Sequence, residues 1–350
     1  RHLSVRAVFD SSWQRLTEEQ RQLFARLAVF RGGFTRDAAE AVTGATLYDL
    51  AMLVNKSLLR RDLQTGRYEM HELLRQYARE HLAASPDGGT AIAEVHAVHY
   101  AALIQQLWLK LISSEQLAAR VMVDADLDNF RQSWRFWLQR RDAVFIRMYF
   151  DPFRMICDLH GWNKTGVELF SEAAAALEPV LASPDEETEV AYAEVLAGQA
   201  YFLANLGYAD AGLKLAKESI AILLRLERFS DMSTPFDFLQ YNAFYIEERE
   251  QAIYRELRDQ IDFTDDVAGR WKRAYSMTWR GRAAAWRGDP DEGRRRLKES
   301  LRMFEQQGDE ISTVFPRLEL AHLAVLQGAY HEARAELKTV MSVARASGYD

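Results

Sequence analysis

The feature that most constrains this chain is a turn-then-helix pattern that returns about every forty residues. Gly207, Gly288 and Gly328 each open such a turn, and they lie 81 and 40 residues apart. Each turn follows a helical run rich in small and aromatic residues. An earlier copy begins at Gly161, and a copy without its glycine fits at 248–252. The pattern predicts stacked helix pairs, in which each pair buries its apolar face against its neighbours.

The helix pairs resemble tetratricopeptide repeats of a slightly long kind. We expect about five pairs, which would form an α-superhelix over residues 141–350. Residues 86–140 are expected to be a helical connector, because Ser85–Thr90 has the composition of a linker and long helical patterns follow it.

Residues 1–85 have the element order of a winged-helix domain. A capping-box pattern at Thr17 starts a helix that Gly32 is expected to stop, and further helices start near Thr35 and Thr46. Two short runs around Leu63–Gly66 then predict a hairpin, the wing. The predicted fold is therefore all-α with one small hairpin.

A family resemblance rests on Met70-His71-Glu72-Leu73-Leu74, which lies where the second strand gives way to a helix. It resembles the Met-His-Asp-Leu-Leu motif of the STAND signalling NTPases, which include plant resistance proteins, apoptotic-protease activators and bacterial MalT- and AfsR-like regulators. Residues 1–10 and 27–35 also resemble the bacterial members. The resemblance implies that His71 contacts the phosphate of a bound ADP. Glu72 replaces the usual Asp and keeps its charge.

By this resemblance, the chain is the regulatory and sensor part of a signal-transduction ATPase. A nucleotide-binding domain that holds ATP or ADP would precede Arg1, and an inducer or partner protein would bind the repeats. The sequence lacks the Gly-x-x-x-x-Gly-Lys-Ser/Thr phosphate loop, and it has no Gly-x-Ser-x-Gly or His-Glu-x-x-His motif. We therefore expect no enzymatic activity, no cofactor and no catalytic residue in this chain.

Two other functions stay open: a plain repeat scaffold for protein–protein interaction and a DNA-binding winged-helix transcriptional regulator. The helix expected over residues 46–57 carries Asp49, Asn55 and Lys56 but almost no basic face. Residues 1–85 hold 13 Lys and Arg against 10 Asp and Glu. Because phosphate contacts supply most non-specific DNA affinity, direct DNA contact is not expected.

Composition indicates a chain of ordinary globular type. The 44 Lys and Arg against 51 Asp and Glu give a net charge of −7, which does not favour nucleic acid or an anionic membrane. Cys157 has no second cysteine to pair with, and no apolar run approaches the ~20 residues of a membrane span. We expect a cytoplasmic protein without membrane contact, and a piece of a longer polypeptide because it starts at Arg1.

Two clusters could be mistaken for sites. His96 and His99 share a helical face, but no metal-binding motif accompanies them, so no metal site is expected. Phe130, Trp134 and Trp137 share a face in the run 126–138, and this stripe is expected to pack in the core.

The candidate ligand-binding residues are Trp271, Tyr275 and Trp279, which form a ridge at i, i+4 and i+8. Such a ridge is expected to be partly buried between repeats. A member exposed on the concave face would be the best anchor for a ligand. Complete burial of all three would remove them as anchors.

Overall fold

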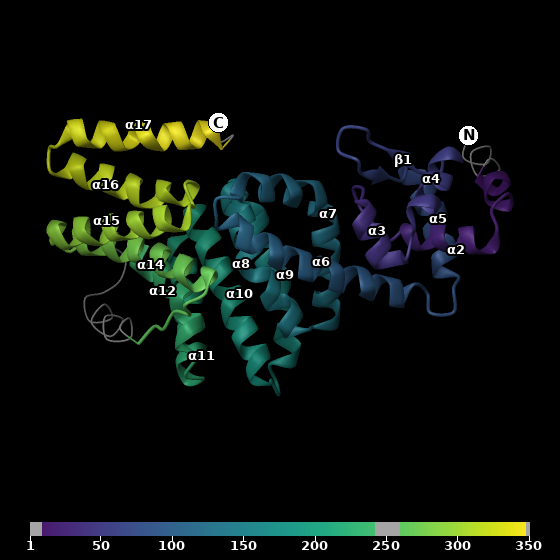
Figure 1. Ribbon diagram of the computed structural model, residues 1–350. Helices are drawn as coiled ribbons and strands as arrows, with labels where there is room; N and C mark the ends of the chain where they lie inside the picture. The colour runs from purple at the N-terminus through teal and green to yellow at the C-terminus, as the bar shows by residue number, and fades with distance from the viewer. Residues whose placement is uncertain (1–8, 242–259, 348–350) are drawn as a thin grey trace. The chain divides into compact units, whose positions relative to one another are not determined.

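A computed structural model describes residues 9–241 and 260–347 of the chain (Figure 1). Over these ranges the fold is helical apart from one two-stranded antiparallel hairpin, which confirms the predicted fold class. None of the helices in these ranges has the length and hydropathy that crossing a membrane requires.

The winged-helix elements follow the predicted order. They are α2 (Glu18–Leu27), α3 (Arg36–Thr43), α4 (Leu47–Asn55), β1 (Arg60–Arg61), β2 (Tyr68–Glu69) and α5 (Glu72–Ala83). Arg60 pairs with Glu69 across the hairpin, and Phe34 adds an isolated bridge to Tyr68. The wing is therefore tied to the segment that connects α2 and α3.

Threonine side chains cap three of these helices. Thr17 and Gln20 form a capping box, Thr35 caps α3, and Thr46 forms a capping box with Asp49. Such a cap satisfies amide donors that the first turn of a helix leaves without partners.

The predicted end of the first helix was wrong by about one turn. The helix stops at Leu27 rather than at Gly32. The N–H groups of Ala28, Val29 and Phe30 bond to carbonyls three residues back, so the chain leaves the helix through a tighter turn. Phe30 gains a buried position in return, because its ring stacks on that of Phe34 with centroids 4.5 Å apart.

Two longer helices follow, α6 (Thr90–Leu111) and α7 (Gln116–Arg140). The chain divides into two compact units: residues 1–104 with 121–140, and residues 105–120 with 141–350. Each long helix therefore contributes to both units. The domain boundaries that we placed near residues 85 and 140 stay predictions.

The second unit is built mainly of helices that follow one another in antiparallel pairs. They are α8 (Ala143–Leu159), α9 (Asn163–Leu177), α10 (Glu186–Asn205), α11 (Ala209–Arg225), α12 (Ser233–Tyr241), α14 (Val267–Trp286), α15 (Pro290–Gln307), α16 (Val314–Leu326) and α17 (Tyr330–Ala346). Single 3-10 turns occur at 178–180, 229–232 and 311–313. Figure 1 shows α14 to α17 stacked in chain order. The repeat copy predicted at 248–252 lies outside the described residues.

Glycines act at two kinds of position in the pairs. Gly207 and Gly288 adopt φ values of 90° and 88° in the turns, where other residues would be strained. Gly281 of α14 and Gly293 of α15 instead allow the two helices to approach closely. A Cβ on Gly281 would lie 3.1 Å from the Gly293 carbonyl oxygen, and one on Gly293 would lie 3.0 Å from the Gly281 oxygen.

Helix α8 contains a proline whose missing N–H is compensated from another helix. Pro152 stands inside α8, so the Met148 carbonyl lacks its usual amide donor. The side-chain amide of Gln105, on α6, donates to that carbonyl. The break in the α8 hydrogen-bond ladder is therefore satisfied by α6.

The predicted aromatic stripe of α7 lies in the core, as expected. Phe130, Trp134 and Trp137 are all buried, and so is Cys157 of α8. These side chains stabilise the fold rather than presenting a reactive or recognition surface.

Candidate functional site

The sensor candidate His71 is the N-cap of α5. Its Nδ1 accepts a hydrogen bond from the backbone N–H of Leu73 at 3.3 Å, and the side chain is exposed. Because Nδ1 acts as the acceptor, the neutral ring carries its proton on Nε2. The cap bond thus fixes the imidazole at the positive end of α5 and leaves a ring N–H donor on the side that faces solvent.

Glu72, which stands where the family motif has Asp, reaches Arg75 one turn along α5. Both of its carboxylate oxygens accept from the Arg75 guanidinium, and this bond is the main reason that the pKa of Glu72 lies below its usual value. The longer side chain therefore keeps its charge engaged along the helix. A cavity of about 340 Å³, lined in part by Met70, Glu72, Arg75 and Arg31, adjoins this helix start.

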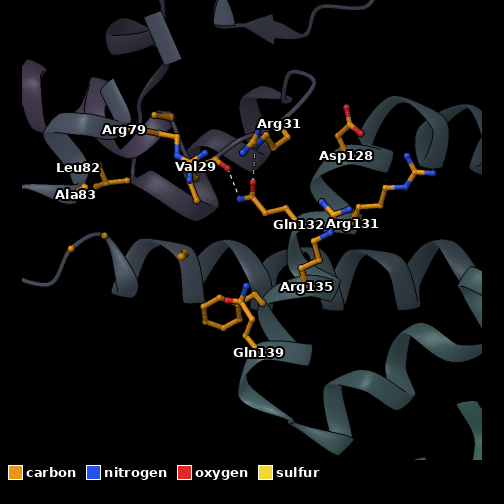
Figure 2. Close-up of a pocket in the computed structure, with 15 residues that line it drawn as sticks. Val29, Arg31, Arg79, Leu82, Ala83, Asp128, Arg131, Gln132, Arg135 and Gln139 are labelled. Carbon is orange, nitrogen blue, oxygen red and sulfur yellow. Dashed lines mark hydrogen bonds between the residues drawn. The ribbon is translucent and has the colours of Figure 1, made fainter. Parts of the chain in front are cut away.

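A larger pocket in the same unit is lined by four arginines, Arg31, Arg79, Arg131 and Arg135 (Figure 2). We call it the arginine pocket. Its volume is about 600 Å³, and Asp128 is its one lining carboxylate. Burial, and then repulsion from Arg75 and Arg79, lower the pKa of Arg31. The lining thus carries an excess of positive charge, which suits a phosphate or carboxylate partner.

Gln132 orders one wall of the arginine pocket. Its side-chain N–H donates to the Val29 carbonyl at 2.6 Å, and its oxygen accepts from Arg31 Nε at 3.2 Å (Figure 2). The guanidinium of Arg31 is therefore held in place by α7 rather than moving freely in solvent.

A buried polar network joins α7 to the turn after α2. Asn129 is fully buried, and its Oδ1 accepts from the Arg31 backbone N–H at 2.7 Å while its Nδ2 donates to the Gly33 carbonyl at 2.9 Å. Its Nδ2 also donates to Asp126 at 3.0 Å. Asn129 thus satisfies two backbone groups between α2 and α3, the Arg31 N–H and the Gly33 carbonyl.

Asp126 extends this network to the wing. Both of its oxygens accept from the Arg67 guanidinium at 2.8 Å, and the Tyr100 hydroxyl donates to it at 3.1 Å. The aromatic face of residues 126–138 was predictable from the sequence, whereas these polar partners were missed. The available signal was an Asp and an Asn three residues apart, directly before that aromatic face.

The two histidines of α6 form no metal site. His96 is buried, and its Nε2 lies 3.3 Å from Asn129 Oδ1. Burial is the main reason that its pKa falls to about 4, so the ring is neutral at pH 7. Across the parts of the chain that the structure describes, no group of three or more His, Cys, Asp or Glu residues could hold a metal ion.

Helix α4, the helix that would read DNA in a winged-helix protein, has an apolar exposed face. Leu47 and Tyr48 are 52% and 79% exposed. Lys56, which directly follows α4, donates its ammonium to the Arg15 carbonyl and to Gln20. A face of this kind lacks the free positive charge that phosphate contacts require.

The predicted ligand anchors of the repeats are all buried. Trp271, Tyr275 and Trp279 are 1%, 6% and 8% exposed, and the Trp271 indole donates to Asp309 at 2.8 Å. None of the three is therefore a surface anchor, because α14 packs its aromatic face against the neighbouring helices. Tyr275 and Trp279 nevertheless line a cavity of about 250 Å³. Whether the ridge contributes to ligand binding stays a prediction.

Comparison with known proteins agrees with this architecture. Residues 16–83 match the family model of a winged helix-turn-helix domain. A crystal structure from Pyrococcus horikoshii, of a Signal Transduction ATPase with Numerous Domains (STAND) protein with a tetratricopeptide repeat sensor, aligns with 97% of this chain at a TM-score of 0.52 and 16% identity. Over the aligned residues, this chain shares the fold of that protein. The fold that the sequence resemblance implied, a winged helix followed by helical repeats, is thereby confirmed.

The proteins that are related to this chain in sequence carry the names of transcriptional regulators. Three mycobacterial proteins, one from Mycobacterium bovis and two from strains of Mycobacterium tuberculosis, are each 25% identical to the winged-helix and repeat chain over 364 residues. They are named as candidate HTH-type transcriptional regulators. The alignments cover 99% of this chain but 40% of each relative, and the chain spans 52% of the Pyrococcus protein.

Proposed function

We propose that this chain is the regulatory and sensor part of a STAND-type signal-transduction ATPase. In this proposal the winged helix holds a nucleotide switch, and the repeat helices bind an inducer or a partner protein. The observation that carries the proposal is the geometry of His71. Its ring is fixed by the α5 cap bond and offers its second N–H outward.

The residues around His71 suit a bound diphosphate. A helix N-terminus favours an anion, and an imidazole N–H can donate to a phosphate oxygen. The excess positive charge of the arginine pocket lies in the same unit. ADP held by a nucleotide-binding domain would supply the phosphate, and His71 would stabilise the closed, inactive state. Inducer binding would favour the open state by differential affinity for the two states.

The test is substitution of His71 in the full-length protein. His71→Ala should raise basal output and shorten ADP retention, because a hydrogen bond to a charged partner contributes ~1.5–3 kcal/mol. That corresponds to roughly a tenfold or larger shift in population. The measurements are basal output, retained ADP and melting temperature.

His71→Asp is the matched variant, because Asp also caps helices well but would repel a phosphate. If His71 is a sensor, both variants raise output. If His71 only caps α5, His71→Asp behaves as wild type while His71→Ala lowers the melting temperature, and the proposal fails.

Two alternatives are separated by other measurements. A plain repeat scaffold would bind its partner with no dependence on nucleotide, so a gene without a phosphate-loop domain would favour it. A DNA-binding regulator would use α4, but the exposed Leu47 and Tyr48 favour a protein-facing surface instead.

A further inference from the structure

Four helices of the repeat unit, which are not consecutive in the chain, line a small cavity of about 250 Å³. Each contributes side chains about one turn apart, so the cavity lies along the face that α8, α10, α12 and α14 share. The lining residues are Arg154 and Asp158, Tyr201 and Asn205, Thr234, Asp237 and Phe238, and Tyr275 and Trp279.

Arg154 is a buried cation for which the described residues supply no hydrogen-bonded anion, although the charges of Asp151 and Asp158 act on it. Its side chain is 3% exposed, and no described residue accepts a hydrogen bond from its buried Nε. Its guanidinium carbon lies 5.4 Å from the ring centroid of Tyr275 and 5.9 Å from that of Tyr201. Aromatic faces stabilise such a cation only in part, and a buried charge is costly without a paired anion.

Two other cations, one on α8 and one on α14, are paired with carboxylates. Arg147, two turns before Arg154 on α8, bonds to Glu187, Glu194 and Asp231 at 2.7 to 3.0 Å. Lys272 of α14 forms an ion pair with Asp151 at 2.7 Å. Arg154 differs from these two cations, because it stands at the wall of a cavity and has no hydrogen-bonded carboxylate among the described residues.

A second polar group in the cavity has no close hydrogen-bond partner among the described residues; burial raises its pKa, and Tyr201 opposes the rise in part. The Tyr275 hydroxyl is buried and has no hydrogen-bond partner among the described residues, although the residue is 6% exposed. Tyr201, in contrast, donates its hydroxyl to Asp158 at 2.7 Å. Buried polar groups are normally satisfied, so Arg154 and Tyr275 together indicate a missing ligand that accepts hydrogen bonds.

Asp237 supplies the opposite chemistry. It is 6% exposed and forms no ion pair with a residue in the described ranges. Burial raises its pKa to about 7, although Ser276, Arg280 and Arg154 oppose the rise. A bound cation would favour the ionised carboxylate. The cavity thus offers a donor pair for an anion and a carboxyl group for a cation.

We propose that this cavity binds a small α-amino acid, whose carboxylate is held by Arg154 and the Tyr275 hydroxyl and whose ammonium group is held by Asp237. Trp279 and Phe238 supply apolar surface for the side chain. The proposal rests on the sensor role proposed above, because it names the chemical class of the inducer. The volume lies just below the ~300–1,000 Å³ of pockets for drug-sized ligands, which fits a metabolite of this size.

Binding is tested directly on the chain of residues 1–350, by titration calorimetry at pH 7.5 with each standard L-amino acid as the probe. For the tightest probe, the amine without its carboxylate and the acid without its amine are titrated next. We expect the amino acid to bind and both truncated compounds to lose roughly tenfold or more in affinity. This readout does not involve His71, so it stands or fails independently of the nucleotide switch.

Matched variants locate the site. Arg154→Met and Tyr275→Phe should each weaken binding, roughly ten- to hundredfold for the charged partner and up to about tenfold for the hydroxyl. Tyr275→Phe removes an unsatisfied group and should leave the melting temperature unchanged or higher. Arg294→Met is the control, because Arg294 pairs with Glu332 and does not line the cavity.

Three results would overturn the proposal. The first is that no standard amino acid binds the folded chain at millimolar concentration, and the second is that the acid without its amine binds as tightly as the intact amino acid. The third is that Arg154→Met and Tyr275→Phe leave the affinity unchanged. If Arg154→Met does not fold, Tyr275→Phe decides the question alone.

Discussion

The unit that contains the winged helix should lose stability as the pH falls, because it buries a neutral histidine. His96 is 1% exposed, and burial lowers its pKa from 6.5 to about 4. The hydrogen bond to Asn129 and the charge of Asp126 oppose this shift, whereas His99 adds to it. The charge-free variant for comparison is His96→Gln, because a Gln amide can still donate to Asn129.

The sign follows from proton uptake. Below pH 6.5 the unfolded chain binds a proton at His96, whereas the folded chain does not bind one until about pH 4. Stability is therefore fully present above pH 6.5 and is lost as the pH falls towards 4. Between pH 7 and pH 5 the loss is about 2 kcal/mol, since one pKa unit corresponds to ~1.36 kcal/mol.

Hydrogen exchange measured on peptides of α6 and α7 reports this unit separately from the repeats. After correction for the intrinsic rate, protection in wild type should fall about thirtyfold from pH 7 to pH 5, because 1.4 kcal/mol is about a factor of ten. His96→Gln should largely remove this slope, and His322→Gln, in the repeat unit, should keep it. Equal slopes in wild type and His96→Gln would refute the reasoning.

Three further outcomes are expected. Titration of this chain with ATP or ADP should show no micromolar binding, because the sequence has no phosphate loop; a micromolar complex would contradict that inference. A mobility-shift assay at physiological salt should show only weak, sequence-independent DNA binding, and a nanomolar, sequence-selective complex would make the winged helix a DNA reader. Asn129→Leu should lower the free energy of unfolding of the first unit by about 2–4 kcal/mol, because the Arg31 N–H and Gly33 carbonyl lose their buried partner; a denaturant midpoint equal to that of wild type would show that water replaces the side chain.

Local chemistry was predictable from the sequence. The caps at Thr17, Thr35 and Thr46 lie where hydroxyl side chains precede apolar periodicity, and the wing turns at the predicted glycine-containing segment. The turn glycines such as Gly207 also adopt the backbone that their spacing suggested. In these cases, residues that are close in sequence determine the structure.

The cavity at Arg154 was not predictable in this way. Its lining comes from four helices, and each supplies only two or three ordinary residues about one turn apart. In the sequence, Arg154 stands between Phe153 and Met155 within an apolar run, and that is the one local sign that a charge is buried there. The absence of a partner became visible only after the helices were placed side by side.

The hydrogen bond from Gln105 to the Met148 carbonyl makes two distant positions interdependent. Replacing Gln105 alone should be costly, because Pro152 leaves that carbonyl without a donor. Replacing Pro152 with Ala would restore a backbone donor and make the glutamine dispensable. The two substitutions should therefore be strongly non-additive, and among related sequences a change at one position should accompany a change at the other. A designer who straightens α8 by removing its proline would free position 105 for a residue of another kind.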